Sequence, residues 1–401
     1  MNNRRFLTLG IVAVVLLALA LWVAQPDYNQ HTTSRLFLPK LSGQLSEIDH
    51  LSVFGGSETA RAELKKVDNK WTLQQRSGYP ADSKKVGGLL IAVAEANIAE
   101  TKTAKAENHA KLELEDPLKA DAKSQLVKFG GGGKDFAVVI GKQERGGSYV
   151  RRDGQDQTYL LDRVLTVPNE ATDWLETNIV DLSSADVSAV DETAKNTPPV
   201  HLARGENDLW QLSEIPKGRK AKAASMLGAA AGSLSGLYFS DVRPASELKG
   251  DPVKHAEFHA KGGLHVEASG YEADGDTWVV FSARVDPLAD ASYQAAETEP
   301  VSVPPAVAKA ASTADAAKPE ADQSASDKAK QAAEKAASDK AAAAKKAHDE
   351  ALDKARDITA RVDGWAYKLP GYKLTELFKS MDDLLEPLED EKKSESKSDK
   401  K

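Results

Sequence analysis

Two stretches of this chain carry the same short motifs in the same order. Asp68 to Leu73 in the first stretch corresponds to Asn207 to Leu212 in the second, and in both an Asn or Asp turn precedes a Trp-x-Leu sequence. Tyr79-Pro80 is likewise answered by Ile215-Pro216, and each pair precedes a helix-like stretch. A repeat on this scale requires each copy to form the same supersecondary unit. The sequence therefore predicts two tandem units, divided near residues 182–189.

The hydrophobic pattern within the first copy predicts mixed α+β structure. Ala60, Ala62 and Leu64 alternate with charged residues, which is typical of a half-buried strand. The segment from Lys84 to Glu95 has apolar residues at offsets of 3, 4 and 7, which favours an amphipathic helix. Ser83 is the residue that we expect to cap this helix. The expected fold is an antiparallel sheet with a helix, present twice.

The repeat also locates an insertion in the second copy. Asp153-Gly154 turns one strand into the next in the first copy, whereas in the second copy the strand through Phe281 finds its partner only from Asp363 onward. Hairpin tips tolerate extra chain because few buried contacts are disturbed. We expect disorder in the Pro-rich first part of 287–360 and, from about Ser326, a solvated helix without a broad apolar face. Two interpretations of the insertion stay open: it extends toward and contacts another envelope component, or it is a lineage-specific expansion without a binding role.

These boundaries divide the chain into six expected segments. They are a cytoplasmic N-terminus with a transmembrane anchor (1–25), a linker (26–46), a first α+β unit (47–182), a second α+β unit (183–286 plus 361–385), an Ala/Lys/Asp/Glu-rich insertion (287–360) and a charged tail (386–401).

An uncharged apolar run from Phe6 to Val23 follows Arg4 and Arg5. Its length is close to the roughly 20 residues that a helix needs to cross a bilayer, and flanking arginines tend to remain in the cytoplasm. We therefore expect a single-pass anchor in the inner membrane, with most of the chain outside the cytoplasm. A cleaved signal peptide is the alternative, although Trp22 is poorly placed for cleavage after Ala24.

Composition excludes several classes of function. The chain has no cysteine, so disulfides, thiolate metal sites and cysteine nucleophiles are impossible. Its formal net charge of -8 disfavours sequence-independent binding of nucleic acid, which needs a basic surface.

The second copy contains the nearest approach to a metal-binding motif, in His255, Glu257 and His259, followed by His265. The repeat predicts a strand here, on which His255, Glu257 and His259 share one face while Phe258 lies on the other. A solvated polar face is the favoured interpretation, so the sequence assigns no metal ligands.

Other motifs also have ordinary structural interpretations. Gly130 to Gly133 lacks the Ser or Thr and the helix that a phosphate-binding loop requires, which favours a hairpin turn. Gly228, Gly232 and Gly236 favour close helix-to-sheet packing, and Leu234 occupies the position where a nucleophile elbow needs serine. The tryptophans of the repeated strands are expected in the cores; they are Trp71, Trp210, Trp278 and Trp365. No catalytic, cofactor-binding or metal-binding residue is assigned.

In combination, the motifs resemble a known bacterial family. They are the apolar N-terminal run, the strand from Ile48 to Phe54 ending in Gly55-Gly56, Trp71-x-Leu73, Tyr79-Pro80-Ala81-Asp82, Lys102-Thr103, Ile140-Gly141-Lys142 and Trp174-Leu175. The chain resembles the family named domain of unknown function 4340, from about residue 20 to 385 outside the insertion. That resemblance implies an envelope protein whose relatives often lie beside components of a gliding-type ABC transport system, and it carries over no catalytic residues.

Three functional hypotheses remain from the sequence. The first is a non-enzymatic, membrane-anchored accessory or binding component of an envelope transport complex. The second is a periplasmic module that binds glycan or peptide, and the third is an envelope hydrolase. The lipid bilayer and a membrane protein complex are the expected partners.

Overall fold

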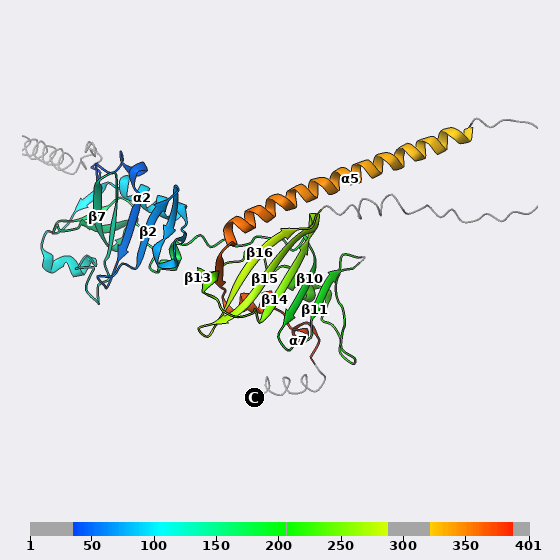
Figure 1. The fold of residues 1–401 in the computed structure, drawn as a ribbon. Helices are drawn as coiled ribbons and strands as arrows, with labels where there is room; N and C mark the ends of the chain where they lie inside the picture. Colours follow the sequence, from blue (N-terminus) through cyan, green and yellow to red (C-terminus); the bar gives the residue numbers. More distant parts are fainter. Residues whose placement is uncertain (1–34, 206, 288–320, 388–401) are drawn as a thin grey trace, which may run out of the picture. The chain divides into compact units, whose positions relative to one another are not determined.

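The computed structural model describes residues 35–205, 207–287 and 321–387. The chain divides between Leu175 and Glu176 into two compact units (Figure 1). Each unit is built on one antiparallel sheet with a few helices, so the predicted α+β class is confirmed.

Unit 1 contains a nine-stranded sheet in the order β4-β3-β2-β1-β6-β7-β8-β9-β5. Its strands are β1 (His50–Phe54), β2 (Ala62–Val67), β3 (Lys70–Leu73), β4 (Tyr79–Pro80), β5 (Ile98–Thr101), β6 (Gln125–Gly131), β7 (Lys134–Glu144), β8 (Gly147–Arg152) and β9 (Thr158–Leu161). Among its described residues, 35–175, the α-helix is α2 (Ser83–Ala94), and the 3-10 turns are η1 (Leu45–Glu47), η2 (Gln74–Arg76), η3 (Ala106–Leu112) and η4 (Ala171–Trp174).

Unit 2 contains an eight-stranded sheet in the order β12-β11-β10-β14-β15-β16-β17-β13. Its strands are β10 (Val187–Ala194), β11 (Val200–Arg204), β12 (Trp210–Leu212), β13 (Asp241–Pro244), β14 (Lys254–Ala260), β15 (Leu264–Ala273), β16 (Asp276–Val285) and β17 (Trp365–Lys368). Its helices are α3 (Ala224–Ala231), α5 (Ala321–Val362), α6 (Gly371–Leu377) and α7 (Met381–Leu384), with 3-10 turns η5 (Ala245–Glu247) and η6 (Lys261–Gly263).

The two sheets follow the same strand order once the short edge strand β4 is set aside. In each, the first three strands form a meander, the fourth lies at the far edge, and the fifth to eighth run from the first strand back to that edge. The helices α2 and α3 occupy the same place, between the third and fourth strands. Shared topology therefore accompanies the shared motifs.

The turns and caps of the first hairpin follow from local chemistry. Asp68 and Asn69 both have positive φ, of 48° and 63°, which gives the tight turn between β2 and β3. The carboxylate of Asp82 accepts hydrogen bonds from the backbone N–H of Lys84 at 2.8 Å and of Lys85 at 3.3 Å, so Asp82, rather than Ser83, caps α2.

The chain before β1 contributes to the core of unit 1. Phe37 and Leu41 are fully buried, although sequence assigned residues 26–46 to a linker. The Phe37 ring meets Tyr159 edge-on at 5.8 Å, and the guanidinium of Arg152 lies 4.9 Å from its centre. These contacts make the described residues from Arg35 onward part of the folded unit.

The insertion interrupts the hairpin between β16 and β17, at the position that the repeat indicated. The last turns of α5 pack against β15, β16 and η6 and bury Ala351, Ala355, Ile358 and Val362. The expectation of a wholly solvated helix is therefore wrong for this part, because residues spaced by 4, 3 and 4 form an apolar stripe. Residues 342–346 of the same helix are exposed.

Several predicted segments lie outside the described residues. They are the Phe6–Val23 run, the Pro-rich part of the insertion at 288–320, and the tail from 388. Within the part of the chain that is described, no helix combines the length and apolar character needed to span a bilayer.

Candidate functional site

The partly exposed face of the unit 2 sheet carries a cluster of histidine, carboxylate and arginine side chains. On β14, Ala256 and Phe258 are fully buried, whereas Glu257 and His259 alternate with them on the other, partly exposed face. The predicted strand and its polar face are thus confirmed. What the sequence did not show is how β10, β11, β15 and β16 extend this face into a continuous network.

Neighbouring strands place histidines and acids side by side. Nε2 of His259 lies 2.7 Å from a carboxylate oxygen of Asp191, and His201 contacts the other oxygen of the same carboxylate. On β15, Nδ1 of His265 lies 2.8 Å from Glu257 and its Nε2 lies 2.8 Å from Asp286. The rings of His259 and His265, which are directly paired across the strands, meet edge to face at 4.6 Å.

Arg284 on β16 joins the acidic members of this group. Its Nε lies 3.1 Å from Glu267, its Nη1 lies 2.8 Å from Asp286, and its Nη2 contacts Glu257. We call the whole group the histidine–carboxylate network; its members are Asp191, His201, Glu257, His259, His265, Glu267, Arg284 and Asp286.

Contacts within the network lower the pKa of three of its carboxyl groups, those of Asp191, Glu257 and Asp286. Burial opposes ionisation of Asp191, but hydrogen bonds from His201 and His259 outweigh it and lower the pKa of that carboxyl. Burial likewise opposes ionisation of Glu257, whereas His265 and neighbouring positive charges lower its pKa. These carboxylates are therefore suited to binding a cation or a cationic partner, and poorly suited to taking up a proton as general bases near neutral pH.

One residue of the unit 2 core has the opposite behaviour. Glu192 lies on β10 beside Asp191 but is only 3% exposed, and burial raises the pKa of its carboxyl to about 8. The nearby Lys379 opposes this shift and Asp383 adds to it. Glu192 is closed off from solvent, so we assign it no binding or catalytic role. Two adjacent acidic residues on a strand are the sequence signal for such a buried acid, since successive side chains point to opposite faces and one of the two then faces the core.

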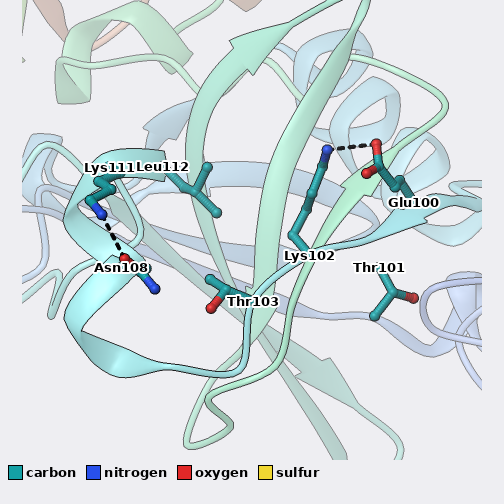
Figure 2. A pocket seen from close by; sticks show the side chains of 7 residues that line it. All are labelled: Glu100, Thr101, Lys102, Thr103, Asn108, Lys111 and Leu112. Atoms are coloured by element: carbon teal, nitrogen blue, oxygen red, sulfur yellow. Dashed lines mark hydrogen bonds and ion pairs between the residues drawn. The ribbon is translucent and has the colours of Figure 1, made fainter.

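Unit 1 contains a shallow depression of about 450 Å³. Figure 2 shows its lining residues, which are Glu100, Thr101, Lys102, Thr103, Asn108, Lys111 and Leu112. The ammonium of Lys102 lies 2.5 Å from Glu100, and that of Lys111 lies 2.8 Å from the amide oxygen of Asn108. The hydrogen bond to Glu100 raises the pKa of Lys102, so its ammonium remains charged.

The depression offers ammonium, amide and hydroxyl groups that donate hydrogen bonds, and the carboxylate of Glu100, which accepts them. Sequence reasoning singled out Lys102-Thr103 only as part of the family motif. Nothing in the local pattern could show that η3 would bring Asn108 and Lys111 to the same place.

The remaining sequence candidates have structural roles. Gly132 and Gly133, with φ of 58° and 76°, make the turn between β6 and β7, so no phosphate-binding loop forms. A Cβ on Gly228 would lie 2.6 Å from the Trp210 ring, which confirms close helix-to-sheet packing there. The expectation is wrong for Gly236, where an added Cβ would meet nothing within 4 Å. Trp71, Trp210 and Trp278 are buried as expected, whereas Trp365 is half-buried.

A Ser/His contact also occurs on the polar face of unit 2. Nδ1 of His255 lies 3.2 Å from Oγ of Ser269, its direct cross-strand partner. The pair lies on the sheet face rather than in the depression of unit 1. A hydrolytic centre also needs a group that orients the histidine and donors for the oxyanion, so this contact alone does not define one.

Comparison with known proteins bears on the family. Residues 71–255 match the family model described as Domain of unknown function (DUF4340). This segment of the chain belongs to the DUF4340 family. The predicted resemblance is confirmed over a range that begins in β3 and ends in β14, and so includes parts of both units. The depression of unit 1 lies within this range, as do Asp191 and His201. No curated protein and no solved structure matches the chain.

Proposed function

We propose that this DUF4340 protein is a non-enzymatic binding component of a cell-envelope ABC transport system. In this proposal the Phe6–Val23 run anchors it in the inner membrane, and its two units, copies of one ancestral unit, lie outside the cytoplasm. The apolar run with Arg4 and Arg5 before it supports the anchor. The family resemblance supports the link to a transport system, because it implies relatives that lie beside components of a gliding-type ABC transport system.

The observation that carries the binding role is the network on unit 2. Its carboxyl groups are paired with histidine and arginine side chains, so the surface presents charged and hydrogen-bonding groups. Such a surface gives orientation and specificity to a protein contact. The depression of unit 1 is a second polar surface, in which the ammonium of Lys102 pairs with the carboxylate of Glu100.

The location is testable because the chain has no cysteine, so any engineered cysteine is the sole thiol. We expect Thr101→Cys, in unit 1, to react with a membrane-impermeant maleimide in cells whose inner membrane is intact. Asn3→Cys should react only after that membrane is opened. Equal protection of both cysteines would place unit 1 in the cytoplasm and refute the proposed topology.

The partner is testable by photo-crosslinking in native membranes. A photoreactive residue at exposed Thr101 or Ser282 samples unit 1 or unit 2, respectively. We expect mass spectrometry to recover membrane subunits of an ABC transporter from at least one position, and none from samples kept in the dark. Recovery of no membrane protein from either position would contradict the binding role.

A glycan or peptide ligand in the unit 1 depression is the second candidate function. The specific observation in its favour is the gathering of hydroxyl, amide and ammonium groups on one concave surface. A library of cell-wall glycans and short peptides should then raise the melting temperature of the wild type but not of Lys111→Ala. Equal shifts in both proteins would place binding elsewhere.

A further inference from the structure

We propose that Glu257, His259 and His265 form a binding site for a divalent transition-metal ion of the zinc type on the polar face of unit 2. This inference concerns residues of the same network that carries the proposed binding role, but it does not depend on the transport system. It rests on three observations: the spacing of the three ligand groups, the carboxylates that hold the two imidazoles, and the charge around them.

The three residues come from two adjacent strands and are already close. One ligand atom from each lies within 4.8 Å of the corresponding atoms of the other two. In a tetrahedral zinc site, bonds of about 2.0–2.1 Å place neighbouring ligand atoms roughly 3.3 Å apart. Cross-strand pairing fixes the backbone positions of His259 and His265, so side-chain rotations alone close this difference.

Each imidazole is also held from its far side by a carboxylate. Nε2 of His259 lies 2.7 Å from Asp191, and Nε2 of His265 lies 2.8 Å from Asp286. Histidines that ligate metals almost always donate their other ring N–H to such a group, which fixes the tautomer and orients the ring. The same bond makes Nδ1 the coordinating atom of each ring, and Nδ1 of His265 already lies 2.8 Å from Glu257.

The local charge favours a cation. The histidine–carboxylate network contains four carboxylates, from Asp191, Glu257, Glu267 and Asp286, and one guanidinium, that of Arg284, which pairs with the last three. Arg284 contacts Glu257 and lies 3.2 Å from Nδ1 of His265, so it competes with a metal ion for the same atoms. Its side chain is 49% exposed and retains Glu267 and Asp286 as partners, so it can yield Glu257 to the ion.

Two imidazoles and one carboxylate are a ligand set typical of zinc with an open coordination position. Oxygen-preferring ions such as Mg²⁺ and Ca²⁺ are disfavoured by the two nitrogen ligands.

Calorimetric titration of the untagged full-length protein with ZnCl₂, after removal of metal by a chelator, tests the site. We expect saturable binding of a single ion by the wild type. His259→Ala and His265→Ala should each weaken binding by more than about a hundredfold, since loss of an outer carboxylate alone typically costs about 10–100-fold. Asp286→Asn, which removes the negative charge of one outer carboxylate, should fall in that smaller range.

His255→Ala is the matched control. This histidine lies on the same strand and the same face but outside the group of three, so zinc affinity should stay within about twofold of the wild type. Arg284→Ala should tighten binding by about tenfold, because it removes a competing positive charge. Glu257→Gln removes one ligand while keeping its size, and far-ultraviolet circular dichroism verifies the fold of every variant.

Absence of saturable zinc binding in the wild type would overturn the proposal. So would equal losses in His255→Ala and His259→Ala, which would indicate nonspecific binding by surface histidines. Weaker binding in Arg284→Ala would show that the arginine supports the site rather than competing for it, and would also overturn the proposal as stated.

Discussion

Buried Glu192 makes the stability of unit 2 depend on pH in a defined direction. Its carboxyl has a pKa of about 8 in the folded chain, against an ordinary value of 4.5. The folded state therefore binds a proton that the unfolded state releases between these two values, so the free energy of unfolding falls as pH rises from 4.5 to 8. At 1.36 kcal/mol for each unit of pKa, the whole difference corresponds to about 5 kcal/mol, of which about 4 kcal/mol falls between pH 5 and pH 8.

Glu192→Gln removes the titrating group and keeps its shape. We expect the variant to match the wild type closely near pH 5 and to exceed its unfolding free energy by about 4 kcal/mol at pH 8. Urea titrations in which unfolding is monitored by hydrogen exchange of peptides from β10 measure the unfolding free energy of unit 2 separately from that of unit 1. Exposed Glu247→Gln is the control and should follow the wild type at every pH.

Other groups titrate in both proteins, so the informative quantity is the difference between variant and wild type at each pH. If that difference changes by less than about 0.5 kcal/mol between pH 5 and pH 8, the burial of Glu192 does not raise its pKa as argued.

Three further predictions concern packing and capping. Gly131→Ala should destabilise unit 1 by about 1–3 kcal/mol, because the added Cβ would lie 1.8 Å from the backbone oxygen of Glu47. Gly87→Ala is the control: its Cβ would meet nothing within 4 Å, so the same denaturant titration should show unit 1 unchanged or more stable. Ile358→Ala should lower the unfolding free energy of unit 2 by about 2–5 kcal/mol, measured by thermal unfolding. Thr359→Ala, at an exposed position, should lower it little, and equal losses in the two variants would contradict docking of α5. Asp82→Ala should cost about 1 kcal/mol through loss of the α2 cap, and rescue by Asn at this position would identify the lost hydrogen bond as the cause.

Much of the secondary structure was predictable because it depends on neighbours in sequence. Alternation on β14 identified its polar and apolar faces, and the spacing of Val86, Leu89 and Val93 identified the buried face of α2. The docking of α5 was missed, although Ala351, Ala355, Ile358 and Val362 carry a helical pattern. Alanine supplies little hydrophobic contrast, so this stripe resembled the Ala-rich chain before it.

The candidate sites were less predictable, because their members come from distant strands. Asp191, His259 and Asp286 are far apart in sequence. Only the order β10-β14-β15-β16 and the register of each strand pair bring them into one network. The depression of unit 1 similarly needs η3 to fold back toward the chain after β5.

The sequence by itself determined the α+β class, the repeated order of elements, the position of the insertion and the kinship with DUF4340. These follow from local periodicity, turn chemistry and short motifs, each of which acts within a few residues. The tertiary structure alone decided which polar residues meet, which acid is buried beside an exposed one, and where α5 docks. Those outcomes depend on strand register and packing, since a shift of one residue would move every side chain of a strand to the opposite face.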